Sequence, residues 1–156
     1  MKRQQLARIL TLALCLGIWW FIFSNSMMNG EASTVRSDAV TGWVNQLLEM
    51  LGLGTVGSFL IRKVAHFAEF AALGWSLALA ADCWFPSAPL SRRSGLAVLV
   101  GAASAAADEG IQLFSQGRSA RLTDLLIDGA GVLAGLLVLR LLQWLVIRRR
   151  HSAGER

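Results

Sequence analysis

The sequence predicts an all-α membrane protein with four transmembrane helices. Hydrophobic residues make up 54 % of the 156 residues and charged residues only 16 %, which is more apolar than an ordinary soluble domain. Four apolar segments approach or reach the length that crosses a bilayer. We expect a single domain, residues 1–156, with spans at about 6–24, 58–81, 94–114 and 125–147.

The charge pattern argues against a nucleic-acid-binding protein. The net charge is +5, but the basic residues gather at the chain ends and in the 82–93 loop instead of forming one basic face. The two cysteines, Cys15 and Cys83, lack the spacing of a metal or redox motif. We therefore expect no disulfide between them.

The first span begins after a basic segment, residues 2–8, and continues as an uncharged run at 9–23. A secretory signal peptide begins in the same way, and Ser24 and Ser26 resemble a small-residue cleavage site. The run nevertheless ends in bulky Trp-Trp-Phe-Ile-Phe, which is typical of an aromatic anchor at the membrane interface. This favours a span that is retained.

An amphipathic helix is expected between the first two spans. Apolar residues at three- and four-residue steps from Val40 to Leu51 form one helical face, and Ser37 or Asp38 can cap its start. The helix either lies in the membrane interface over a site or packs on the bundle as a connector. Glycines between residues 52 and 57 mark the loop that follows.

The second span, 58–81, carries charges in its first half. Arg62, His66 and Glu69 fall within about 60° of one another at 100° per residue, with Lys63 at the edge of this face. We expect the polar face to point into the bundle and the phenylalanines of this span to face lipid.

The third and fourth spans place acids where they meet. Asp108 and Glu109 lie in the last two turns of the third span, and Asp128 lies in the first turns of the fourth. Ionisable groups inside a bilayer are costly and mark candidate functional sites. Gly131 and Gly135, four residues apart, would let another helix approach the fourth span closely.

The positive-inside rule predicts the orientation. With both termini and the 82–93 loop in the cytoplasm, ten of the fifteen basic residues lie inside. The remaining five lie outside, and they are Arg36, Arg62, Lys63, Arg118 and Arg121. In this orientation the acids of three spans share the outer half of the membrane.

These residues resemble the VanZ-like family of small bacterial membrane proteins. The resemblance rests on an ordered series of motifs: Phe23-Ser24-Asn25, Lys63-Val-Ala-His66-Phe67-Ala-Glu69-Phe70, Leu73-Gly74, Asp108-Glu109-Gly-Ile-Gln112-Leu-Phe114, Gly117-Arg118, Asp124, Asp128, Gly131 and Gly135. The chain departs from the family pattern at Phe70, where Tyr is frequent, and at Asp128, where Asn is frequent. The resemblance implies a multi-pass protein of the bacterial cytoplasmic membrane and cell envelope, in a family whose name-giving member is linked to reduced susceptibility to the glycopeptide teicoplanin.

The polar residues leave three interpretations open. In the first, they bind a lipid or a lipid-linked cell-wall precursor. In the second, they are the active site of an intramembrane hydrolase or transferase that acts on a lipid-linked substrate. In the third, they are a structural network that holds the helices together or contacts another membrane protein. The candidate binding residues are Lys63, His66, Glu69, Asp108, Glu109, Gln112, Arg118, Asp124 and Asp128. Of these, the candidates for acid–base catalysis are His66, Glu69, Asp108 and Glu109.

Two further observations bear on the chemistry. The sequence requires no cofactor, although the histidine and the acids are ligand types that could hold a divalent metal. No nucleophilic Ser or Cys accompanies His66, and Ser104, one turn before Asp108, is interpreted as a small packing residue, so enzymatic activity is not favoured. Arg118 either meets a lipid phosphate or pairs with Asp124 across the turn.

Overall fold

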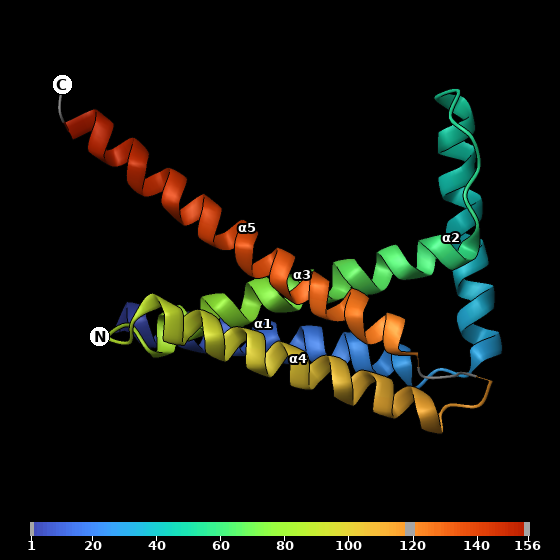
Figure 1. Cartoon of the computed structure of the whole chain (residues 1–156), viewed down its shortest axis with the longest axis horizontal. Coiled ribbons are helices and arrows are strands. Elements are labelled where there is room, and N and C mark those ends of the chain that lie inside the picture. The colour runs from blue at the N-terminus through green and yellow to red at the C-terminus, as the bar shows by residue number, and fades with distance from the viewer. Residues whose placement is uncertain (1, 118–120, 155–156) are drawn as a thin grey trace.

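The structure of the chain is a computed structural model that describes residues 2–117 and 121–154, and its secondary structure there is entirely helical (Figure 1). The helices are α1 (Lys2–Ser26), α2 (Gly30–Met50), α3 (Ser58–Trp84), α4 (Leu90–Phe114) and α5 (Leu122–Gly154). Four of them, α1, α3, α4 and α5, are long and apolar enough to cross a membrane. The predicted all-α protein with four spans is confirmed.

Helix α2 begins earlier than the sequence analysis predicted, with its cap eight residues before Ser37. Asn29, not Ser37 or Asp38, caps it, because the Asn29 side chain accepts a hydrogen bond from the backbone N–H of Ala32 at 2.8 Å. Ser37 lies inside the helix, where its hydroxyl donates to the carbonyl of Ser33 at 2.9 Å. The glycine-marked loop after the helix is present, and Gly52 has a positive φ of 69°.

Helix α3 is the centre of the bundle and packs against α1, α2, α4 and α5. Its closest approach is to α5: a Cβ added at Gly131 would lie 2.5 Å from the carbonyl oxygen of Phe67, and one at Gly135 would overlap the backbone of Ala71. The predicted close approach at these two glycines is therefore confirmed. It brings the acid-bearing start of α5 against the polar half of α3.

The expectation that the phenylalanines of this span face lipid is wrong for Phe70. Phe70 is completely buried among the helices, whereas Phe59 and Phe67 are exposed. The reason is the close α3–α5 contact, since a Cβ at Gly131 would meet the Phe70 side chain at 3.1 Å. Glycine on α5 thus lets the two helices pack closely beside Phe70.

The two ends of the bundle differ. The N-terminus, the turn between α3 and α4 and the C-terminus lie toward one end, and the connections from α1 to α2 and from α4 to α5 lie at the other, where α2 projects from the bundle (Figure 1). This relative arrangement agrees with the expected topology. Which end faces the cytoplasm, and whether α2 lies in the interface, remain predictions.

The start of α2 is attached to the loop that follows α4. The backbone N–H of Gly30 donates to the carbonyl of Gln116 at 2.8 Å, and a Cβ at Gly30 would overlap the carbonyl group of Gly117. Gly117 itself has a positive φ of 75°, a conformation that favours glycine. The hydroxyl of Ser115 donates to the carbonyl of Ser26 at 2.8 Å, which adds a contact to α1.

The opposite end carries its own polar cluster. The carboxylate of Asp82 on α3 accepts hydrogen bonds from Arg93 of α4 at 3.0 Å and from Arg140 and Gln143 of α5 at 2.6 and 2.8 Å. We call these four residues the Asp82 cluster. Both cysteines of the chain are free, as expected.

Candidate functional site

Polar side chains from α1, α3, α4 and α5 meet inside the bundle, near the end where α2 begins. The central group consists of His66 on α3, Asp108 on α4 and Asp128 on α5. Each offers one donor atom, and these three atoms all lie within 4.8 Å of one another. We call these residues the His66 cluster.

Asp108 is fully buried and has a hydrogen bond to each carboxylate oxygen. The hydroxyl of Ser26 donates to Oδ1 at 2.6 Å, and the amide of Gln112, one turn along α4, donates to Oδ2 at 2.8 Å. Two donors to one carboxylate fix its orientation. Sequence analysis missed Ser26, and its only signal was a small polar residue at the end of an apolar span.

Asp128 has a different environment. It is also fully buried, but neither of its carboxylate oxygens has a hydrogen-bond partner among the described residues. Its nearest polar neighbour is His66, with 3.6 Å between Nδ1 and Oδ1. A buried carboxylate without hydrogen-bond donors is unfavourable. Asp128 therefore lowers the stability of the folded protein.

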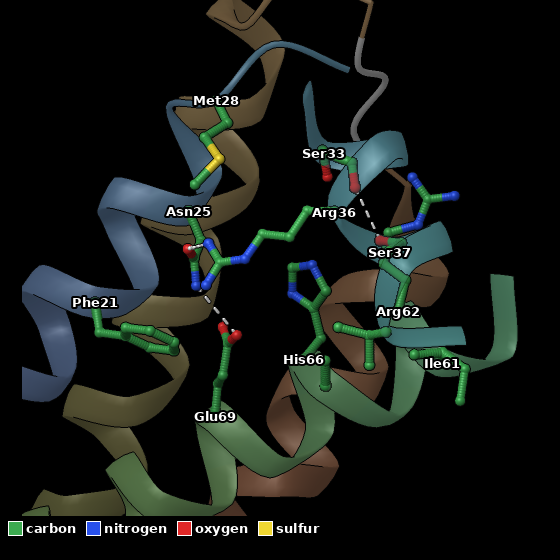
Figure 2. Close-up of a pocket in the computed structure, with 12 residues that line it drawn as sticks. Phe21, Asn25, Met28, Ser33, Arg36, Ser37, Ile61, Arg62, His66 and Glu69 are labelled. Carbon is green, nitrogen blue, oxygen red and sulfur yellow. Dashed lines mark hydrogen bonds between the residues drawn. The ribbon is translucent and has the colours of Figure 1, made fainter. Parts of the chain in front are cut away.

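Glu69 belongs to a hydrogen-bonded chain that reaches α2. The amide of Asn25 donates to Glu69 at 3.3 Å, and Arg36 donates to the Asn25 oxygen at 2.8 Å (Figure 2). Neither Asn25 nor Arg36 was among the candidate binding residues. The motif Phe23-Ser24-Asn25 gave a signal for Asn25, but a long-range link to α2 is not visible in the sequence.

A pocket of about 200 Å³ opens between α1, α2 and α3. Figure 2 shows Arg36 extending across it to Asn25, with the His66 ring below the Arg36 side chain and Glu69 below Asn25. The polar lining is Asn25, Ser33, Arg36, Ser37, Arg62, His66 and Glu69, and the apolar lining is Phe21, Met28, Val40, Ile61 and Ala65. We call this the α2 pocket.

A second pocket of about 180 Å³ is lined by residues of α3, α4 and α5 and the segments that precede α5. Its lining includes Arg62 and His66, which also line the α2 pocket. Lys63 is part of this lining and forms an ion pair with Asp124. His66 therefore borders both spaces as well as the buried acids.

Glu109 has a hydrogen-bond partner outside the His66 cluster. One oxygen of Glu109 accepts a hydrogen bond from the backbone N–H of Arg121 at 2.9 Å, before the start of α5. Arg118 lies outside the described residues, so neither interpretation of it is tested, although Asp124 is already paired with Lys63. Ser104 packs as expected and also accepts a hydrogen bond from the Trp19 indole at 2.8 Å.

A comparison with known protein families identifies the family of this chain. The family described as VanZ/LLP1 matches residues 11–143. The chain belongs to the VanZ/LLP1 family. The matched range contains every residue of the His66 cluster and of the α2 pocket. No curated protein and no solved structure matches the chain.

Membership of the VanZ/LLP1 family and four apolar helices of spanning length make this a multi-pass membrane protein. Its polar groups can act chemically in two ways. Guanidinium and imidazole groups beside an apolar wall can receive an anionic head group with its attached chain. An imidazole beside carboxylates can hold a proton or a cation.

Proposed function

We propose that this VanZ-family protein binds the anionic head group of a lipid or a lipid-linked cell-wall precursor, in the outer half of the bacterial cytoplasmic membrane. The observation that carries the proposal is the α2 pocket, where Arg36, Arg62 and His66 border a space of about 200 Å³. This volume lies below the usual range for drug-sized ligands. It fits a phosphate-sized group better than a whole precursor.

The charges of the pocket favour an anion. Within the described segments, Arg62 forms no ion pair, and the guanidinium of Arg36 donates to the neutral amide of Asn25. An arginine without a carboxylate partner keeps its planar set of donors available for phosphate oxygens. Glu69 lies behind Asn25 and can accept from a hydroxyl or amine of the same head group.

The apolar wall of the pocket suits the remainder of such a ligand. Phe21 and Ile61 belong to helices of the bundle, so their side chains lie where an acyl or prenyl chain would run beside α1 and α3. Helix α2 supplies Arg36 and Val40 and therefore covers the head group from one side. Binding a cell-envelope precursor in this way would change its presentation at the outer surface and lower susceptibility to teicoplanin.

The test compares two arginine substitutions with a matched control. Arg36→Gln and Arg62→Gln should each weaken binding of anionic lipid to the protein in nanodiscs and abolish teicoplanin tolerance in cells that express it. The amount of protein in the membrane should stay unchanged, because neither guanidinium is paired with a carboxylate among the described residues. Arg92→Gln, an exposed residue at the opposite end, should alter neither result.

The structural alternative predicts another outcome. If the polar residues only join the helices, Arg36→Gln or Arg62→Gln would lower the amount of folded protein, and lipid binding per folded molecule would not change. Full lipid binding together with full teicoplanin tolerance in both variants would exclude the proposed pocket function.

A further inference from the structure

We propose that the His66 cluster is a binding site for one divalent transition metal ion, with zinc as the best match to its donors. The ligands are a ring nitrogen of His66 and one carboxylate oxygen each from Asp108 and Asp128. The inference goes beyond the proposed lipid binding and does not depend on it, since a metal can be measured without any lipid ligand.

The first argument is geometric. In a zinc tetrahedron with bonds of about 2.0–2.2 Å, neighbouring donor atoms lie about 3.4 Å apart. The distance of 3.6 Å between His66 Nδ1 and Asp128 Oδ1 is close to this value, and all three donors lie within 4.8 Å of one another. Closing the set to bonding distance requires the three donor atoms to move closer together than they are in this structure.

The second argument is the state of Asp128. Both of its oxygens and Nδ1 of His66 are buried and without a hydrogen-bond partner among the described residues. Unpaired buried polar atoms are uncommon because each costs about 1–3 kcal/mol. A cation bound between His66 and Asp128 would give their unpaired atoms a partner. Such a cation would also explain why the two side chains face each other.

The third argument is charge. Two ionised aspartates and a neutral imidazole would carry a total charge of −2, which one divalent ion balances. Isolated charges in such surroundings are strongly unfavourable, whereas a neutral metal–ligand set is not. Lys63, the nearest lysine along α3, is already paired with Asp124.

The fourth argument is the support around Asp108. Ligating carboxylates are commonly held by outer hydrogen bonds that fix their orientation. Ser26 and Gln112 donate to the two oxygens of Asp108 at 2.6 and 2.8 Å. Each oxygen can accept a second contact, so these bonds position the carboxylate without preventing ligation.

Imidazole selects the class of ion. Carboxylate oxygens alone would suit Mg²⁺ or Ca²⁺, but a nitrogen donor and a set of three protein ligands favour zinc and similar transition metals. Three protein ligands leave a fourth position for water. His66 also borders both pockets, so water has space near this position.

The test uses the full-length protein purified in detergent and stripped with a chelator. Titration with Zn²⁺, and with Co²⁺ as a coloured probe, should give one ion per chain and a tetrahedral Co²⁺ spectrum. Loss of a hydrogen-bond partner of a ligand typically weakens metal binding by about 10- to 100-fold. Asp128→Asn and His66→Asn remove a ligand itself and should weaken binding by more than this. Ser26→Ala should weaken it within that range, because only the support of Asp108 is lost.

Controls separate metal binding from folding. Asp38→Asn changes an exposed aspartate on α2 and should bind Zn²⁺ like the unaltered protein. Zn²⁺ should raise the melting temperature of the unaltered protein and of Asp38→Asn but not that of Asp128→Asn, because only a ligand bound to the folded state stabilises it. Size-exclusion chromatography in the same detergent verifies that each variant is folded.

The proposal is overturned if the stripped protein binds no stoichiometric Zn²⁺, or if folded Asp128→Asn binds it as tightly as the unaltered chain. It is equally overturned if a tenfold excess of Mg²⁺ displaces the ion. Loss of lipid binding in Arg62→Gln with intact Zn²⁺ binding would leave the metal site standing, so the two proposals fail separately.

Discussion

Each end of the bundle contains an aspartate close to side chains of other helices, partly exposed Asp82 at one end and fully buried Asp128 at the other, but their surroundings differ. At one end both oxygens of Asp82 accept hydrogen bonds, from Arg93, Arg140 and Gln143. At the other end the oxygens of Asp128 accept none among the described residues. The first arrangement is what a carboxylate needs in order to hold helices together.

This difference shows how a structural acid can be distinguished from a functional one in a membrane protein. Sequence analysis placed Asp128 inside the fourth span and Asp82 in the 82–93 loop, so only Asp128 was a candidate functional residue. The two aspartates differ in their hydrogen-bond donors. A carboxylate whose oxygens all accept hydrogen bonds contributes to stability, whereas a buried carboxylate without donors costs stability and is retained for another purpose. The following predictions test that distinction, beginning with the largest expected effect.

Asp82→Ala should lower the free energy of unfolding by about 3 kcal/mol. This value lies at the lower end of what breaking a buried ion pair costs, because Asp82 is partly exposed. The loss leaves Arg93 and Arg140 without a carboxylate. Unfolding by denaturing detergent in mixed micelles measures the change. A loss below about 1 kcal/mol would mean that the Asp82 cluster is not the structural counterpart of the His66 cluster.

Ser26→Ala should cost about 2 kcal/mol in the same assay. The hydroxyl donates to the fully buried Asp108 at 2.6 Å, and hydrogen bonds to charged groups contribute about 1.5–3 kcal/mol. Ser24→Ala is a matched control, because the Ser24 hydroxyl donates to the carbonyl of Phe21 in its own helix. Equal losses in the two variants would contradict a special role for Ser26.

Asp128→Asn should have the opposite sign. In metal-free buffer it should stabilise the protein by about 1 kcal/mol, since it removes a buried charge that has no donor. Measured beside Asp82→Asn, which should destabilise, this substitution gives the clearest contrast between the two ends. Destabilisation by Asp128→Asn in the absence of metal would show that His66 alone satisfies the carboxylate.

The smallest effect is expected for the ion pair between Lys63 and Asp124. The side chains of Lys63 and Asp124 are 14 % and 17 % exposed to solvent. Because solvent reaches both charges, the coupling energy should be about 0.5–1 kcal/mol. A double-mutant cycle with Lys63→Gln and Asp124→Asn measures it. Complete additivity would indicate that the pair contributes nothing to stability and would leave Lys63 available to a ligand.

The spans were predictable because length and apolar composition alone determine them. A close approach of another helix to α5 was also predictable, since Gly131 and Gly135 are four residues apart on one face, but the identity of that helix, α3, was not. The start of α2 was not, because residues 30–39 lack an apolar period and the cap is a single side chain, Asn29. Helix beginnings depend on such local bonds more than on pattern.

The polar contacts were predictable in part. His66, Asp108 and Asp128 stood out as charged groups in apolar helices, and the structure brings them together. Ser26, the partner of Asp108, did not, because a small polar residue at the end of a span looks like the beginning of a loop. The Asp82 cluster was missed for another reason: its partners come from three helices, and pairing over such distances along the chain leaves no local pattern.

The contact between Gly30 and Gly117 decides where a foreign peptide can be inserted into this protein. Backbone meets backbone there, and the N–H of Gly30 is bonded to Gln116, so a tag in either connection would separate α2 from the bundle. The loop after α2 is different, since a side chain added at Gly54 would meet nothing within 4 Å. A reporter placed at Gly54 would leave the α2 pocket intact and reveal which side of the membrane this end of the bundle faces.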